Sequence, residues 1–384
     1  MVPMPSRVIY LDHQATSPCR AEVMAAMEPW WREHAANPSS RQHPAGVQAA
    51  AALNLARQRI STALGASAGR LVFTSGATEA NNLALKGLAE AELEAGGQRR
   101  HLVTLCTEHR AVLDPLRHLA RYGFELTELP VQASGLVDLN QLEAALRDDT
   151  LLVSVMAAHN EIGVIQPIAA IAQRCRARAV PLHCDAAQAA GHLPLNVQDL
   201  DVQLLSLSAH KLGGPMGVGA LWVADGIRIA PQLHGGSQEG GWRAGTPALP
   251  LIVGFQKALE LALQDQPERL LHLGALRDAL WEGMRHLDGI ALNGVATPRL
   301  AHNLNVRVDG VDGVALHQQL RRHLAVSSGS ACSRGEPSHV LQALGLSRQQ
   351  AAAAVRFSLG PDSTAEEIEH ACRVFCTTVE GLRI

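Results

Sequence analysis

Residues 206–215 read SLSAHKLGGP, so a lysine follows directly on an apolar run. The run closes the segment DVQLLSLS, residues 201–208, whose length and composition predict a short strand buried on both faces. Gly213 and Gly214 come next, and glycine permits a tight turn and the close approach of a ligand to the backbone. The stretch therefore predicts a strand end that presents Lys211 to a ligand.

Lysine is rare in this chain, which makes Lys211 informative. Of the 33 basic residues, three are lysines: Lys86, Lys211 and Lys257. The first and the last lie in amphipathic helical stretches, where an ion pair or a solvated face explains them. A desolvated lysine can lose its proton and attack a carbonyl group, which arginine cannot do. Lys211 is thus a candidate for a covalent link to a cofactor, and a purely structural lysine is the alternative.

Short apolar segments alternate with helical stretches along the first 250 residues. We expect strands over 70–76, 100–106, 123–130, 150–157, 179–185 and 201–208. We expect helices over 77–95, 110–121, 138–147 and 167–178, with Asp138 capping the third and Pro167 opening the fourth. This alternation predicts an α/β fold with a mainly parallel sheet in a large domain.

The alternation of predicted strands and helices ends after about residue 250. A helical tract over 251–288 is followed by strand candidates near 302–308 and 354–359, which predicts a smaller α+β domain. We expect the large domain to span 16–255. We expect the small domain to combine 1–15 with 256–384.

Unusual residues follow two other predicted strands. Residues 76–78, Gly-Ala-Thr, open a helix whose first amides are free donors, which favours a phosphate site, with a capping turn as the alternative. Asp185 ends a strand and Gln188 lies about one helical turn beyond it; helix capping is the alternative for Asp185. Ligands of open parallel sheets bind beyond the carboxyl ends of the strands, so these groups should meet Lys211. A lysine, a carboxylate and a phosphate cup are together typical of a pyridoxal phosphate site.

Composition narrows the classes of function. With 384 residues, 47% of them hydrophobic, and a formal net charge of -3, the chain has no basic excess that would attract nucleic acid. No apolar stretch approaches the roughly 20 residues of a membrane helix, and the first residues lack the pattern of a signal peptide, so we expect a cytoplasmic protein with no membrane partner. The seven cysteines are scattered without zinc-site spacing. We therefore expect neither disulfides nor a metal.

Nine motifs occur in a fixed order along almost the entire chain: NPSS, FTSGATEANNLALKG, TEHRAVLDP, NEIGVIQPI, DAAQAAG, SAHKLGGP, RAGTP, SSGSAC and RFSLG. With YLDHQATSP near the start, the series resembles the cysteine desulfurases that supply iron–sulfur cluster assembly. These belong to the class V aminotransferase family of pyridoxal phosphate enzymes. The resemblance implies an aminotransferase-like fold and conversion of L-cysteine to L-alanine.

The resemblance also implies roles for individual residues. Lys211 would carry the cofactor through a Schiff base, Asp185 would pair with the pyridine nitrogen, Gln188 would bond the ring hydroxyl, and His109 would stack on the ring and move protons. The implied cofactor contacts are Gly76, Ala77, Thr78, His109, Asp185, Gln188, Ser208, His210, Lys211 and Thr246. In this family, the residue matching Thr246 reaches across a homodimer interface. Arg356 would clamp the substrate carboxylate, and Asn37 and Asn160 would help to orient it.

Cys332 carries the chemistry that separates this family from its relatives. It lies in AVSSGSACSRGEPSHVL, residues 325–341, whose Ser, Gly and Arg content predicts a mobile surface loop. Under the resemblance its thiolate takes the substrate sulfur as a persulfide and passes it to an acceptor protein. A related selenocysteine or cystine lyase is the first alternative. A scaffold component without catalysis is the second.

Overall fold

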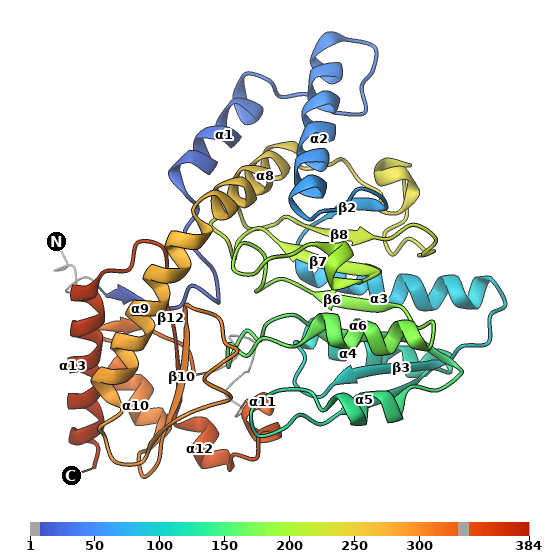
Figure 1. Cartoon of the computed structure of the whole chain (residues 1–384). Coiled ribbons are helices and arrows are strands. Elements are labelled where there is room, and N and C mark those ends of the chain that lie inside the picture. Colours follow the sequence, from blue (N-terminus) through green and yellow to red (C-terminus); the bar gives the residue numbers. More distant parts are fainter. Residues whose placement is uncertain (1–7, 329–337, 384) are drawn as a thin grey trace.

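The structure is a computed structural model that describes residues 8–328 and 338–383. Its largest element is a seven-stranded sheet with the order β2-β8-β7-β6-β5-β3-β4 (Figure 1). The strands, in chain order, are β2 (Arg70–Thr74), β3 (His101–Leu105), β4 (Glu125–Leu129), β5 (Thr150–Met156), β6 (Leu182–Asp185), β7 (Leu204–Ser208) and β8 (Gly219–Val223). The β7-β6-β5-β3-β4 run is parallel, while β8 lies antiparallel to both β7 and β2. The predicted α/β class with a mainly parallel sheet is confirmed.

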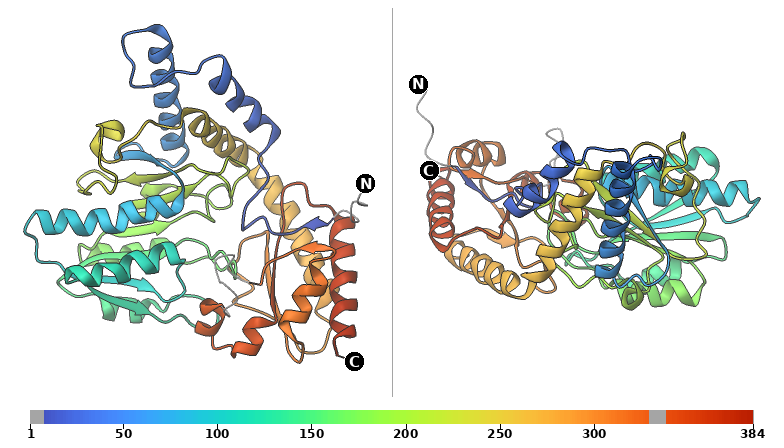
Figure 2. Two further views of the ribbon diagram at one scale, coloured as in Figure 1. Left: turned by 180° about the vertical axis from the view of Figure 1, so that it is seen from behind. Right: turned by 90° about the horizontal axis from the view of Figure 1, so that it is seen from above.

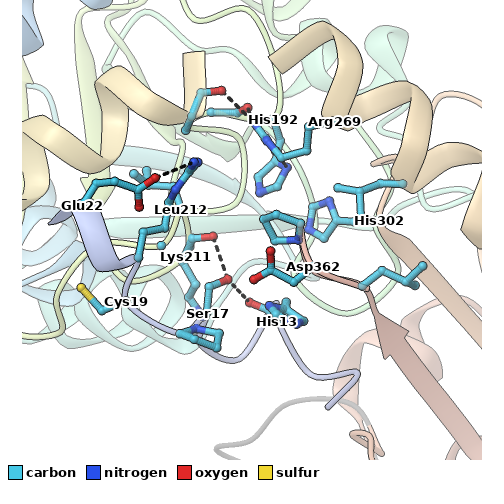
Figure 3. A pocket seen from close by; sticks show the side chains of 18 of the residues that line it. His13, Ser17, Cys19, Glu22, His192, Lys211, Leu212, Arg269, His302 and Asp362 are labelled. Atoms are coloured by element: carbon cyan, nitrogen blue, oxygen red, sulfur yellow. Dashed lines mark hydrogen bonds and ion pairs between the residues drawn. The ribbon is translucent and has the colours of Figure 1, made fainter. Parts of the chain in front are cut away.

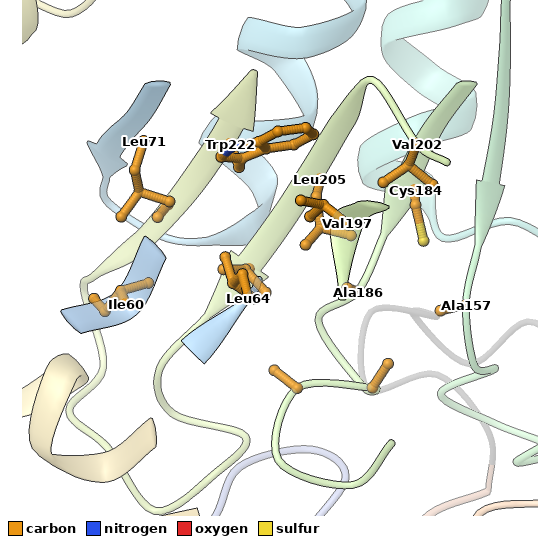
Figure 4. Packing of buried hydrophobic residues seen from close by; sticks show 14 of the residues in the cluster. Ile60, Leu64, Leu71, Ala157, Cys184, Ala186, Val197, Val202, Leu205 and Trp222 are labelled. Carbon is orange, nitrogen blue, oxygen red and sulfur yellow. The ribbon is translucent and has the colours of Figure 1, made fainter. Parts of the chain in front are cut away.

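Helices cover both faces of this sheet, as expected for parallel strands. Those of the larger unit are α1 (Ala21–Arg32), α2 (Pro44–Ala63), α3 (Ala77–Glu94), α4 (Arg110–Leu119), α5 (Leu139–Ala145), α6 (Ile168–Ala177), α7 (Val197–Leu200) and α8 (Leu249–Gln264). Alternate strand residues face opposite layers. Leu71 and Leu205 pack in one apolar cluster with Ile60 of α2 (Figure 4), while Val72 and Leu204 pack with α3 and α4 in another.

A second, antiparallel sheet of three strands lies beside the first (Figure 2). It consists of β9 (Ile290–Leu292), β10 (Asn303–Val308) and β12 (Ala354–Ser358), packed against α9 (Gln266–Met284), α10 (Gly313–Leu320) and α13 (Ala365–Gly381). The pair β1 (Ile9–Tyr10) and β11 (Leu324–Ala325) and the short helices α11 (His339–Ala343) and α12 (Arg348–Ala352) complete this unit. It is the smaller α+β unit that the sequence predicts.

The expected helices agree closely with the structure, with two corrections. Asp138 caps α5 by accepting hydrogen bonds from the amides of Asn140 and Gln141, whereas Pro167 is the residue just before α6 rather than its first. The predicted single tract over 251–288 is wrong. It is broken at Asp265, because Pro267 has no N–H to continue the α8 hydrogen-bond pattern and lies instead in the first turn of α9.

The expected domain boundary at residue 255 falls inside α8 and stays a prediction. Among the residues the structure describes, no helix is long and apolar enough to cross a membrane.

Candidate active site

A cavity of about 450 Å³ opens at the carboxyl ends of β5, β6 and β7, between the two sheets. The sequence predicts eleven of the residues that line it: Gly76, Ala77, Thr78, His109, Asn160, Asp185, Gln188, Ser208, His210, Lys211 and Arg356. They come from six separate segments of the chain. The volume lies within the range of about 300–1,000 Å³ that small-molecule sites occupy.

Lys211 stands in the turn after β7, where Gly213 adopts a positive φ of 78°. Its Nζ donates hydrogen bonds to the backbone carbonyls of Gln14, at 2.6 Å, and Ala15, at 2.8 Å. The side chain is therefore held at the cavity wall by a segment nearly 200 residues away in sequence. Sequence reasoning missed Gln14, which is almost fully buried and also lines the cavity.

Asp185 is the last residue of β6, and its carboxylate is fixed from two sides. Oδ1 accepts a hydrogen bond from the amide of Ala187 at 2.9 Å, and Oδ2 accepts one from Nδ2 of Asn81 at 2.7 Å. Asn81 is fully buried on α3, and its own Oδ1 has no hydrogen-bond partner. The signal for Asn81 in the sequence is an amide at a core-facing position of the helix. It orients the carboxylate that points into the cavity.

The first turn of α3 forms the opposite end of the cavity. Gly76 precedes the helix with a φ of 147°, so the first amides of this 18-residue helix face the cavity unpaired within the helix. His210 lies opposite, and its Nδ1 is 3.1 Å from Oγ1 of Thr16. Burial, followed by the charge of Lys211, lowers the pKa of His210 to about 4. His210 is therefore neutral at physiological pH and offers hydrogen bonds rather than charge.

His109 is the N-cap of α4 and forms one wall of the cavity. Its Nδ1 accepts a hydrogen bond from the amide of Ala111 at 3.0 Å, which fixes the ring. Burial lowers the pKa of this imidazole, which Asp185 opposes and Lys211 reinforces. Its neighbour Glu108 is fully buried, and burial raises the pKa of that carboxyl well above its usual range.

Arg356 is 2% exposed and reaches the cavity from β12 of the smaller unit. Nη1 donates to the carbonyl of Asn160 at 2.7 Å, and Nη2 pairs with Oδ1 of Asp12 at 2.5 Å. Nε is buried without a hydrogen-bond partner. A guanidinium that lines a cavity suits an anionic ligand.

Three predicted site residues are not brought to this cavity by the described chain. Asn37 is exposed, and its Oδ1 accepts from the amide of Ser39 in a surface turn. Thr246 is also exposed, on the segment before α8. Cys332 lies outside the described residues. The roles of all three stay predictions.

A second cavity, of about 350 Å³, lies on the other side of the Lys211 turn (Figure 3). The rings of His192 and His302 stack there with centroids 4.0 Å apart. Burial lowers the pKa of His192 to about 3 and that of His302 well below its usual range. These imidazoles are therefore neutral at physiological pH.

Comparisons with known proteins agree with this geometry. The family model described as Aminotransferase class-V matches residues 9–370. The chain is 45% identical to the protein named cysteine desulfurase IscS of Colwellia psychrerythraea and 46% identical to that of Vibrio atlanticus, in each case over 98% of this chain and 93% of the relative. A solved structure titled NifS-like protein is 34% identical, with a TM-score of 0.91, and covers 98% of this chain and 100% of that one. Another, titled SspA in complex with cysteine, is 36% identical with a TM-score of 0.82 and covers 93% and 100%.

The chain belongs to the class V aminotransferase family, and within it to the cysteine desulfurases. These are pyridoxal phosphate enzymes, and the residues around the cavity fit that cofactor. The cavity combines an amine at Lys211, an oriented carboxylate at Asp185 and unpaired helix amides after Gly76. These groups match the aldehyde, the ring nitrogen and the phosphate of the cofactor, respectively.

Proposed function

We propose that this chain is a pyridoxal phosphate-dependent cysteine desulfurase that converts L-cysteine to L-alanine and retains the sulfur on Cys332 as a persulfide. The observation that carries the proposal is the meeting of Lys211, Asp185 and Arg356 around one cavity in a member of the cysteine desulfurase family. These three residues come from β-strands or strand ends of both sheets. The bound cofactor supplies an electrophilic carbon and an electron sink.

Each residue then has a task that its contacts support. Lys211 would hold the cofactor covalently and, once released, would take the proton from Cα of the substrate. Asp185, oriented by Asn81, would keep a proton on the ring nitrogen. The phosphate would be bound by Gly76, Ala77, Thr78, Ser208 and His210, the ring hydroxyl by Gln188, and the ring face by His109. Arg356 and Asn160 would bind the substrate carboxylate.

Cys332 performs the step specific to this family. Its thiolate attacks Sγ of the substrate, the bond between Cβ and Sγ breaks, and the carbon skeleton leaves as alanine after protonation. The persulfide then passes to an acceptor protein for iron–sulfur clusters or other thio-cofactors. We further propose that the enzyme is a cytoplasmic homodimer in which Thr246 contributes to the partner's phosphate site, and that Asn37 assists substrate binding.

A single-turnover assay with L-cysteine tests this function. We expect one alanine and one protein-bound sulfane sulfur per active site in the parent protein. Cys332→Ser should bind L-cysteine and change the cofactor absorbance, but accumulate no persulfide. Alanine formation at the parental rate by Cys332→Ser would instead support the alternative, a selenocysteine or cystine lyase that releases sulfur without a persulfide.

A further inference from the structure

The segment 12–17, from the motif YLDHQATSP, contacts Lys211 and the residue before it. Thr16 contacts the ring of His210, and the amide of Ser17 donates to the carbonyl of His210 at 2.9 Å. The carbonyls of Gln14 and Ala15 accept the two hydrogen bonds from Nζ of Lys211. The segment thus runs alongside the Lys211 turn and offers its amine two acceptors.

Gln14 is tied to its surroundings in several directions. Its amide donates to Oγ of Ser358 at 3.0 Å, and its Oε1 accepts from Nδ2 of Asn303 at 2.5 Å, so both strands β12 and β10 hold it. Its carbonyl oxygen accepts from Nε2 of Gln188 at 3.0 Å, in addition to Lys211. The residue is 1% exposed. Its carbonyl therefore has a fixed position between the two sheets.

Backbone carbonyls only accept hydrogen bonds, and an ammonium group has three N–H donors and no acceptor. The carbonyl pair of Gln14 and Ala15 therefore binds the non-covalent form of Lys211, whose nitrogen carries at least two N–H donors. Lys211 takes this form when a substrate amine replaces it on the cofactor. The substrate enters as an ammonium and its nitrogen loses two protons as it takes the place of Lys211, while the Lys211 nitrogen gains two and leaves as an ammonium, so charge and atoms balance.

We propose that Gln14 is a positioning residue that holds this carbonyl pair in place as the resting site of released Lys211. The inference rests on the proposed function, because it assigns a place to the lysine between its two covalent states. A fixed resting site favours displacement of Lys211 by an amino acid. The same site slows the return of Lys211 to a free aldehyde.

Two measurements on Gln14→Met test the proposal. The substitution should weaken the binding of L-alanine but speed the capture of the cofactor. Titration of the cofactor-loaded protein with L-alanine, followed by visible absorbance, should give an apparent Kd about fivefold higher than in the parent, the effect of weakening a hydrogen bond to a charged group. Covalent capture of pyridoxal phosphate by cofactor-free protein should be about fivefold faster, because more of the Lys211 amine is free to react. Ser358→Ala removes the acceptor for the Gln14 amide together with a longer hydrogen bond to the carbonyl of Leu11, and it should shift both values in the same directions by less.

Gln166→Met is the matched control. Gln166 is also buried and makes two hydrogen bonds to backbone, with Val137 and Gly135, but it does not line the cavity. We expect both values to stay parental. The inference would be overturned if Gln14→Met and Ser358→Ala both captured the cofactor more slowly and bound L-alanine more weakly. It would also be overturned if neither measurement changed in the two variants. Failure of the parent protein to capture the cofactor on Lys211 would overturn the proposed function itself.

Discussion

Arg356 shows how single residues prepare this site. The Arg356 guanidinium is buried between the carboxylate of Asp12 and the carbonyl of Asn160, and its Nε remains unpaired. Because Asp12 pairs with the guanidinium, the buried charge of Arg356 has a partner before a substrate arrives. The planar group can then offer N–H donors to a carboxylate in a fixed geometry, which lysine cannot reproduce.

We expect Arg356→Lys to raise KM for L-cysteine at least thirtyfold, since lysine keeps the charge but cannot offer the planar pair of N–H donors to the substrate carboxylate. The absorbance of the bound cofactor should stay parental, because Arg356 does not contact it in the proposed arrangement. Steady-state alanine production measures the first and a visible spectrum the second. Arg307→Lys on β10, at a side chain that pairs with Asn293 and Asp309, is the control and should leave KM unchanged. A parental KM for Arg356→Lys would rule out the clamp.

Some residues of the candidate active site can be predicted from the sequence and others cannot. Lys211 and Asp185 stand out because each breaks an apolar strand at its carboxyl end, and the local pattern predicts them. Asn81 and Gln14 do not, because their meaning depends on partners 104 and 197 residues away, Asp185 and Lys211. Buried amides have the same local appearance whether they orient a catalytic group or satisfy a backbone turn.

At the scale of elements, the central strands β5, β6 and β7 carry a buried polar row below the cavity. His183 of β6 lies in it, with Nδ1 2.8 Å from Oγ of Ser154 and Nε2 2.9 Å from Oγ of Ser206. Burial lowers the pKa of His183 to about 4, which Asp185 partly opposes. The unfolded chain binds this proton near pH 6.5, so the imidazole stabilises the fold fully above that pH and progressively less as pH falls toward 4.

His183 alone should therefore cost about 2 kcal/mol of unfolding free energy between pH 7 and pH 5. We expect His183→Gln to make the dependence of unfolding free energy on pH less steep over this range, by about 1.4 kcal/mol per pH unit at its steepest. Urea unfolding at a series of pH values measures the slope. His286→Gln, at an exposed histidine after α9, is the control. An unchanged slope in His183→Gln would contradict the assignment.

Elements were predicted well where the pattern is local. All six expected strands of the large sheet occur, because runs buried on both faces are distinctive, and the alternation with helices indicated their parallel order. β8 was not foreseen, since GALWV is short and follows a glycine-rich turn without a helix between. The break at Asp265 was also missed, because both flanking helices are apolar and Pro267 is tolerated at the start of the second.

At the scale of the whole molecule, α1 and α2 stand apart from the smaller unit (Figures 1 and 2). Both helices carry exposed apolar side chains. Met24, Trp31, Val47 and Leu55 are 54%, 59%, 54% and 47% exposed, respectively. Exposed apolar groups gathered on neighbouring helices are typical of a protein–protein interface. They favour this end of the molecule for contact with a second copy, as the proposed homodimer requires.

Trp31→Glu should raise the dimer dissociation constant at least tenfold, because it places a charge in an apolar contact. Sedimentation velocity across a concentration series measures the constant. Leu271→Glu replaces an even more exposed apolar residue, 77% exposed on α9 of the other unit, and should leave the dimer intact. If Leu271→Glu raised the dimer dissociation constant more than Trp31→Glu, the interface would lie on the smaller unit instead. If the parent protein were a monomer, the proposed homodimer would be wrong.

The account as a whole depends on a covalent bond between Lys211 and pyridoxal phosphate, and the chain makes that bond easy to assign because it contains only three lysines. Reduction of the loaded protein with borohydride, followed by peptide mass mapping, tests it directly. We predict a stoichiometric phosphopyridoxyl group on Lys211 and none on Lys86 or Lys257. A label on either of those two, or no label on any lysine, would contradict the account.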